Sequence, residues 1–79
     1  MHANPEDRPL WALPVYVQVD KLSTMKVHIP GHGAQWLTVS LCPGLRMIRP
    51  GEMGPIHMPD WLRRERHIAP SRWVREVKE

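Results

Sequence analysis

The sequence contains a single cysteine among its 79 residues, and features of several common protein classes are missing with it. One cysteine, Cys42, excludes an intramolecular disulfide, so the framework of small secreted proteins is absent and a reducing compartment is the simpler expectation. The sequence also lacks a Walker loop, a GxGxxG turn, an HExxH helix and an EF-hand loop. A domain of this size has little surface left for a walled pocket once its core is packed, so we do not expect an enzyme.

No hydrophobic run is long and uninterrupted enough to predict a membrane span. Residues 27–45 carry no charged side chain, but prolines, glycines and two histidines interrupt them, which a bilayer-spanning helix tolerates poorly. The first eight residues carry Glu6 and Asp7 in place of a basic cluster, so we expect no secretory signal. These patterns predict a soluble chain with no membrane partner.

Proline is abundant, and three of the nine prolines stand at positions 5, 9 and 14. This spacing favours extended, polyproline-like backbone, so we expect residues 1–14 to form an arm. The chain is long enough for one core only, and residues 15–79 are expected to form a single small β-rich domain. The arm either folds back over this domain or docks on another chain through Trp11 and Leu13.

Alternating apolar and polar residues predict antiparallel strands in the first half of the domain. Residues 15–19 and 25–29 each place apolar side chains on one face, and we expect them to pair as a hairpin. A third alternating run covers residues 36–41. Pro43-Gly44 predicts a type II turn after it, because glycine adopts the required positive φ. The predicted core residues of these runs are Val15, Val17, Val19, Val27, Ile29, Leu37, Val39 and Leu41.

Shorter segments complete the predicted fold. Residues 45–49 and 56–58 are candidate fourth and fifth strands, and Asp60 is a candidate N-cap for a helix over residues 61–67. Residues 71–79 fit either a helical or a strand period, and we favour a short helix. The predicted fold class is mainly β, a small antiparallel meander or open barrel with an extended N-terminal arm and one or two short C-terminal helices.

The five histidines and Cys42 raise the question of a metal or catalytic site. His28 and His32 straddle a Pro-Gly pair, so they do not share a helical face, and Cys42 has no CxxC partner. We therefore predict no metal and no cofactor. Cys42 precedes a turn, without a helix N-terminus to lower its pKa, and is predicted to be a buried or half-buried structural thiol. We expect no catalytic residue.

Arginine and tryptophan gather in the last third of the chain. The first twenty residues carry a net negative charge, whereas residues 45–79 carry a net positive charge. Guanidinium groups interleaved with indole rings are enriched at protein interfaces and also occur where nucleic acid binds. The mixed-sign surface favours a protein partner, and a small basic nucleic-acid-binding module is the alternative. The predicted contact residues are Trp11, Leu13, Trp61, Arg63, Arg64, Arg66, Arg72, Trp73 and Arg75.

The segment LRMIRPGEMGPIHMPDWLRR, residues 45–64, resembles a pattern in small bacteriophage virion proteins of the head, neck and tail. In that pattern a strand runs into Arg-Pro-Gly and then, after a short excursion, into a proline that begins a helix containing Trp. This chain differs in carrying Gly54-Pro55 and in placing Trp61 two residues after Pro59.

The resemblance implies a non-enzymatic assembly protein that forms a homo- or hetero-oligomer with other protein chains. A decoration, connector or baseplate component fits this description, and its location is the virion or the cytoplasm of the host cell. A phage-encoded inhibitor that docks on a host protein is a further alternative, since it also needs only a shaped surface.

Overall fold

A computed structural model describes residues 9–77 of the chain. They form an antiparallel sheet and one α-helix, and two short 3-10 helices, Val39–Leu41 and Leu45–Met47, lie between the third and fourth strands. The predicted mainly β class with an open antiparallel sheet is confirmed. In chain order the elements are β1 (Leu10–Asp20), β2 (Thr24–Ile29), β3 (Gly33–Thr38), β4 (Met53–Pro59), α1 (Asp60–Glu65) and β5 (Arg75–Glu76).

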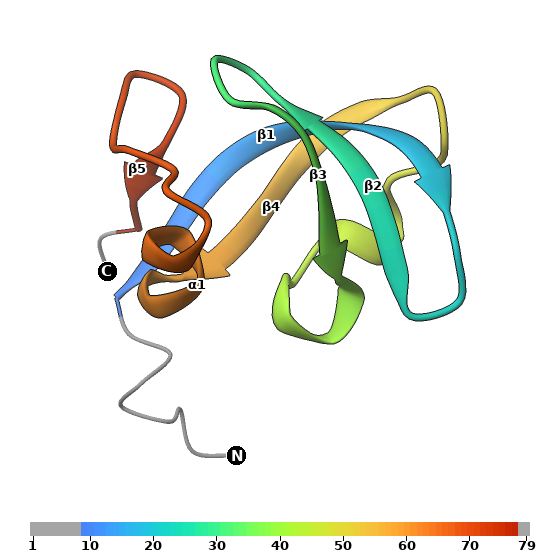
Figure 1. Cartoon of the computed structure of the whole chain (residues 1–79), viewed down its shortest axis with the longest axis horizontal. Coiled ribbons are helices and arrows are strands. Elements are labelled where there is room, and N and C mark those ends of the chain that lie inside the picture. Colours follow the sequence, from blue (N-terminus) through green and yellow to red (C-terminus); the bar gives the residue numbers. More distant parts are fainter. Residues whose placement is uncertain (1–8, 78–79) are drawn as a thin grey trace.

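The long strand β1 is the centre of the sheet. The strand order is β3-β2-β1-β4, and β5 pairs with the start of β1. The first half of β1 pairs with β4 and β5, whereas its second half pairs with β2 (Figure 1). The expected arm is therefore wrong for Leu10 to Pro14, which pair with Pro59 to Pro55 inside the sheet. Residues 1–8 of that arm lie outside the described residues.

The predicted hairpin between the second half of β1 and β2 is confirmed, and a bulge interrupts it. Val17 pairs with Val27, but Val19 pairs with Lys26, so Gln18 is an extra residue on β1. An extra residue turns the side chains that follow it to the other face of the sheet. Val19 was expected in the core and is instead 37 % exposed for this reason.

Three predicted segments take another form. β3 ends at Thr38 and a 3-10 helix follows, so Leu41 lies at the surface instead of in the core. Gly44 has the positive φ that we expected, 93°, but residues 45–49 begin with a 3-10 helix instead of a strand. The described part of the tail, residues 71–77, contains the short strand β5 in place of the favoured helix. The strand predicted at residues 56–58 is confirmed within β4.

The core fills the inner face of the curled sheet, and α1 closes one end of it (Figure 1). Alternate residues of the strands point inward, and Leu45 and Ile48 are buried three residues apart, the spacing at which side chains of a 3-10 helix align. Trp11 and Val39 are partly buried against this cluster. The buried apolar residues are Leu13, Val15, Val17, Met25, Val27, Ile29, Leu37, Cys42, Leu45, Ile48, Ile56, Met58, Leu62, Ile68 and Val74.

The helix α1 is shorter than predicted and begins differently. It covers Asp60–Glu65, with Pro59 as the residue before the helix, and no side chain caps its first turn. Asp60, which we predicted as the N-cap, is the first helical residue, and its N–H donates to the carbonyl of Pro9 (3.0 Å). Among residues 9–77 the structure contains no helix with the length and apolar composition needed to cross a bilayer.

Candidate functional site

Three side chains meet around the carboxylate of Asp60, at the start of α1. Asp60 is 8 % exposed, and its Oδ1 accepts hydrogen bonds from Trp11 Nε1 (2.8 Å) and Arg63 Nη2 (2.9 Å). Its Oδ2 lies 2.8 Å from Arg64 Nε in an ion pair. The Arg63 guanidinium also lies over the Trp11 ring, 4.2 Å from the ring centroid, which is a cation–π distance. We call these four residues the Asp60 cluster.

Helical spacing and strand pairing together build the Asp60 cluster. Arg63 and Arg64 follow Asp60 by three and four residues, so all three side chains lie on one face of α1. Trp11 arrives from β1, where its neighbour Leu10 pairs with Pro59, the residue before the helix. Our sequence analysis missed Asp60 as the centre of the site. The i, i+3, i+4 spacing of acid and arginines was the available signal.

The arginines keep Asp60 ionised. The hydrogen bond from Arg63 is the largest effect on the pKa of the Asp60 carboxyl and lowers it below its ordinary value. Burial acts in the opposite direction, while the Trp11 hydrogen bond and the positive charge of Arg64 add to the lowering. One carboxylate between two guanidinium groups leaves the cluster with an excess positive charge.

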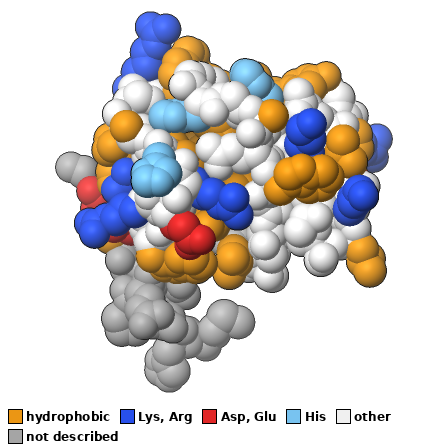
Figure 2. All heavy atoms as spheres, in the orientation of Figure 1, with side chains coloured by type: hydrophobic (Ala, Val, Ile, Leu, Met, Phe, Trp, Pro, Cys, Tyr) orange, Lys and Arg blue, Asp and Glu red, His pale blue; other side chains and the backbone are white. Residues whose placement is uncertain are grey.

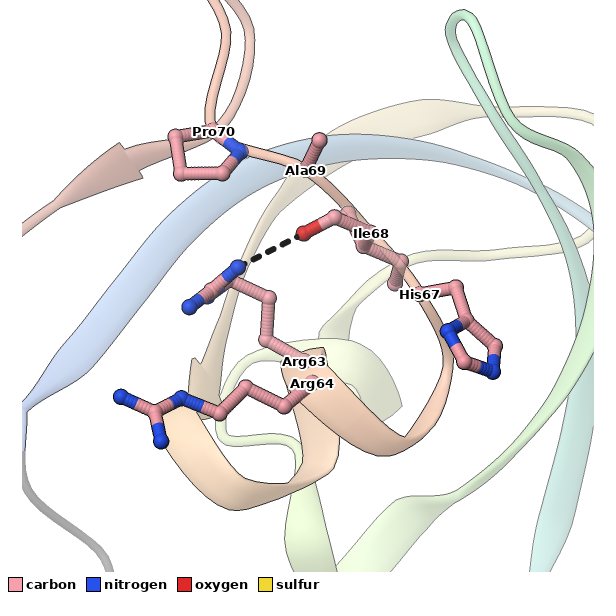
Figure 3. A pocket seen from close by; sticks show the side chains of 6 residues that line it. All are labelled: Arg63, Arg64, His67, Ile68, Ala69 and Pro70. Carbon is pink, nitrogen blue, oxygen red and sulfur yellow. Dashed lines mark hydrogen bonds between the residues drawn. The ribbon is translucent and has the colours of Figure 1, made fainter.

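The end of α1 turns the chain back over the cluster. His67 has a φ of 58°, its N–H donates to the Arg64 carbonyl, and the N–H of Ile68 donates to the Arg63 carbonyl. This pair of bonds is the Schellman arrangement that ends many helices. Arg63 Nη1 then donates to the carbonyl of Ile68 (3.0 Å), as Figure 3 shows. Arg63 is therefore held at both ends of its guanidinium.

A shallow depression of about 370 Å³ lies beside this turn. Figure 3 shows the guanidinium groups of Arg63 and Arg64 on one side of α1 and the His67 ring on the other. The Arg64 side chain is 74 % exposed and contacts Asp60 through Nε. Within residues 9–77 its Nη atoms have no hydrogen bond, and the high exposure of the side chain leaves them accessible to a partner. The lining residues are Arg63, Arg64, His67, Ile68, Ala69 and Pro70.

The depression combines cationic and apolar surface but does not enclose a ligand. Ala69 and Pro70 are exposed and apolar, while Arg63 and Arg64 supply charge beside them. Figure 2 shows basic and histidine side chains gathered on the side of the molecule that holds α1. Such a surface suits a carboxylate next to a small apolar group. Because the depression is open, the molecule that presents these groups must be large enough to cover its open side.

Other predicted contact residues lie apart from the Asp60 cluster. Leu13, predicted as a contact residue, is 2 % exposed in the core and presents no contact surface. Trp61 is 36 % exposed on α1. Trp73 is 46 % exposed at the tip of a tight turn, residues 71–74, with the Arg72 guanidinium 5.0 Å from the centroid of its ring. Figure 1 shows that this loop extends away from α1.

The remaining two predicted arginines are exposed. Arg75 lies on β5, opposite Ala12 of β1. Arg66 follows α1, and its charge lowers the pKa of the Cys42 thiol, but burial of that thiol is the larger effect and raises the pKa to about 11. Cys42 is a buried free thiol, as predicted. It stays protonated near neutral pH and is not activated as a nucleophile.

Within the described range, no three His, Cys, Asp or Glu side chains come together in a group that could hold a metal ion. Comparisons of the chain with protein-family models, with curated proteins and with solved structures found no match. The chemistry of the site is therefore inferred from its own contacts.

Proposed function

We propose that this chain is a non-enzymatic assembly protein that binds another protein chain through the depression beside α1. The observation that carries the proposal is the state of the two arginines that line it. Arg63 is fixed by Asp60, Trp11 and the Ile68 carbonyl, while Arg64 is anchored through Nε and leaves its Nη atoms in solvent. A partner carboxylate can therefore bind an arginine that has already lost part of its side-chain entropy.

A protein partner fits this surface better than a small molecule. The depression is open, so a small ligand would keep most of its surface in water, whereas ligand pockets bury most of theirs. Arginine and tryptophan are enriched at protein interfaces, and such residues carry much of the binding energy there. Trp61, on the same helix but outside the lining of the depression, is also partly exposed.

The resemblance of residues 45–64 to small phage virion proteins supports a structural role in a virion. This segment runs from the second 3-10 helix through β4 into α1, so it includes both arginines of the depression. A decoration, connector or baseplate component would use such a surface in each repeated copy. The partner that this proposal requires presents an acidic side chain beside a small apolar group.

The proposal is tested by the native mass of the complex isolated from the cells that make the chain. We expect the wild-type chain in a complex much heavier than one chain, and Arg64→Glu released from it, with at least about 30-fold weaker binding, because a like charge replaces the paired one. Arg49→Glu is the matched control, since Arg49 is also exposed but lies outside the depression.

Circular dichroism of Arg64→Glu checks that the fold is retained, since this ion pair is largely exposed on the arginine side and contributes little to stability. A wild-type chain that is isolated only as a single copy contradicts the proposal. If Arg49→Glu and Arg64→Glu are released from the complex to the same extent, the interface does not lie at the depression beside α1.

A further inference from the structure

The outer face of the sheet is a second surface with its own chemistry. The strands turn one face toward the core, and their opposite face carries no covering element in the described part of the chain (Figure 1). Strand register aligns the side chains of this face into rows across the sheet. One row contains Met53, Tyr16, His28 and Ala34, on β4, β1, β2 and β3. The next contains Val19, Lys26 and Trp36.

Two aromatic rings on this face are exposed to solvent. Tyr16 is 38 % exposed and Trp36 is 42 % exposed. Tyr16 and Trp36 lie two strands apart and in adjacent rows, which places them roughly 12 Å apart by the standard spacings of a sheet. This exceeds the 3.4 Å rise between stacked bases of one strand, so the two rings can each stack on a separate base. Val19, in the same row as Trp36 but separated from it by Lys26, is also exposed on this face and owes its position to the bulge in β1.

The charges around the Trp36 ring are mostly positive. Lys21 Nζ lies 5.8 Å from the centroid of the Trp36 ring, and Lys26 is the cross-strand neighbour of Trp36. Asp20, the carboxylate at the end of β1, is already paired with Arg46 (3.3 Å). Glu52 stands just before β4, far from Trp36 but next to Met53, the cross-strand partner of Tyr16. Figure 2 shows basic and hydrophobic side chains interspersed on the side of the molecule that holds β2 and the end of β1.

We infer that this outer face binds single-stranded nucleic acid. Aromatic rings offer stacking surfaces for unpaired bases, and neighbouring cations attract the phosphates. A duplex does not fit, because its bases are stacked inside and cannot reach the rings. This face also differs from the depression at α1 in its cations, which are lysines here and arginines there. Lysine is depleted at protein interfaces whereas arginine is enriched there, and Lys21 and Lys26 both lie beside Trp36.

The test is fluorescence anisotropy of labelled single strands, a 12-nucleotide oligothymidylate and a 12-nucleotide oligouridylate, titrated with the full chain. We expect binding that weakens as salt rises from 50 to 200 mM. Trp36→Ala should reduce the affinity about 5- to 150-fold, the range measured for loss of one stacking ring. Trp36→Phe, which keeps a ring, should restore most of it, and Lys26→Glu should weaken binding.

Trp73→Ala is the matched control, because Trp73 is also half-exposed with a cation over its ring but lies in the turn before β5. Trp73→Ala should leave the affinity for the oligonucleotides unchanged. Arg64→Glu should also leave it unchanged, because Arg64 lies at the depression beside α1. The two variants Trp36→Ala and Arg64→Glu therefore test this inference and the proposed function separately. Circular dichroism confirms that each variant is folded.

Three results would overturn the inference. The first is absence of binding to either oligonucleotide by the wild-type chain at 50 mM salt. The second is equal affinity for a hairpin duplex of the same length, since stacking on unpaired bases would then not be the source of binding. The third is an unchanged affinity for Trp36→Ala together with a change in its native mass, which would make this face a protein interface.

Discussion

Asp60 shows how one side chain can join two parts of the chain that are far apart in sequence. Its carboxylate binds Trp11 from β1 and both arginines of α1. The side chain is 12 % exposed, so its charge is compensated by these donors more than by water. The same contacts place Arg63 and Arg64 along the depression, so the stability of the helix start and the geometry of the site depend on one residue.

Asp60→Asn should destabilise the fold by about 2 kcal/mol, because it removes charge-assisted hydrogen bonds and leaves Arg63 without a counter-charge. Asp20→Asn is the matched control, since its ion pair with Arg46 is exposed and is expected to contribute about 0.5 kcal/mol. Urea unfolding of both variants measures the difference. An equal effect of the two substitutions would show that Asp60 stabilises the fold no more than a surface ion pair does.

The lowered pKa of Asp60 also gives this residue a pH dependence with a defined sign. A carboxyl whose pKa is lower in the folded state stabilises that state fully above its unfolded pKa, about 3.9. This contribution is lost as the pH falls from there through the lowered folded pKa. Urea midpoints of the wild-type chain should therefore fall more steeply below about pH 4 than those of Asp60→Asn. Parallel curves would contradict this expectation.

At the scale of elements, the segment between β3 and β4 depends on a close backbone approach. Gly44 has a φ of 93°, and a Cβ placed on it would lie 3.1 Å from the carbonyl oxygen of Pro55 in β4. The turn at Gly44 therefore sets how near the 3-10 helices come to the sheet. The backbone bond from His57 N–H to the carbonyl of Pro43 (2.9 Å) holds the same contact.

Gly44→Ala should be more destabilising than Gly51→Ala, which separates steric contact from backbone strain. Gly51 has a similar φ, 87°, but nothing lies within 4 Å of its Cβ position. Both substitutions carry a left-handed backbone cost of about 1 kcal/mol, and Gly44→Ala should cost roughly 1 kcal/mol more because Pro55 must move. Thermal unfolding of the two variants measures this. Equal losses of stability in the two variants would mean that β4 moves away from the added methyl group with no cost in free energy.

For the hairpin of β1 and β2, the sequence pattern was sufficient to predict the structure. The inward alternation of Val15 and Val17, and that of Val27 and Ile29, predicted the hairpin because a buried face requires a period of two. The same rule was wrong at Val19, because a bulge is a local change of register that composition does not reveal.

For the whole molecule, β1 is the strand on which every other strand but β3 pairs. A chain of this length buries a modest share of its surface and has little stability in reserve. Loss of one half of its central strand should therefore affect the entire fold. Residues 10–14 are part of this strand, and they pair with β4.

Deletion of residues 1–13 should abolish cooperative unfolding, because it removes the part of β1 that pairs with β4 and β5, together with Leu13 in the core and the Trp11 bond to Asp60. Differential scanning calorimetry measures the transition directly. A truncated chain with a transition near that of the full chain would show that β4 and β5 hold their places without this half of β1.

The sequence by itself determined the strand character of the first half of the domain and the positive φ at Gly44, because both depend on residues close together in the chain. Only the tertiary structure decided that Leu10 to Pro14 join the sheet, that the tail adds β5, and that Trp11 meets Asp60. Those outcomes depend on which distant segments pair. Local periodicity does not specify that choice, since the free energy that selects a partner comes from burial and hydrogen bonds formed between segments remote in sequence.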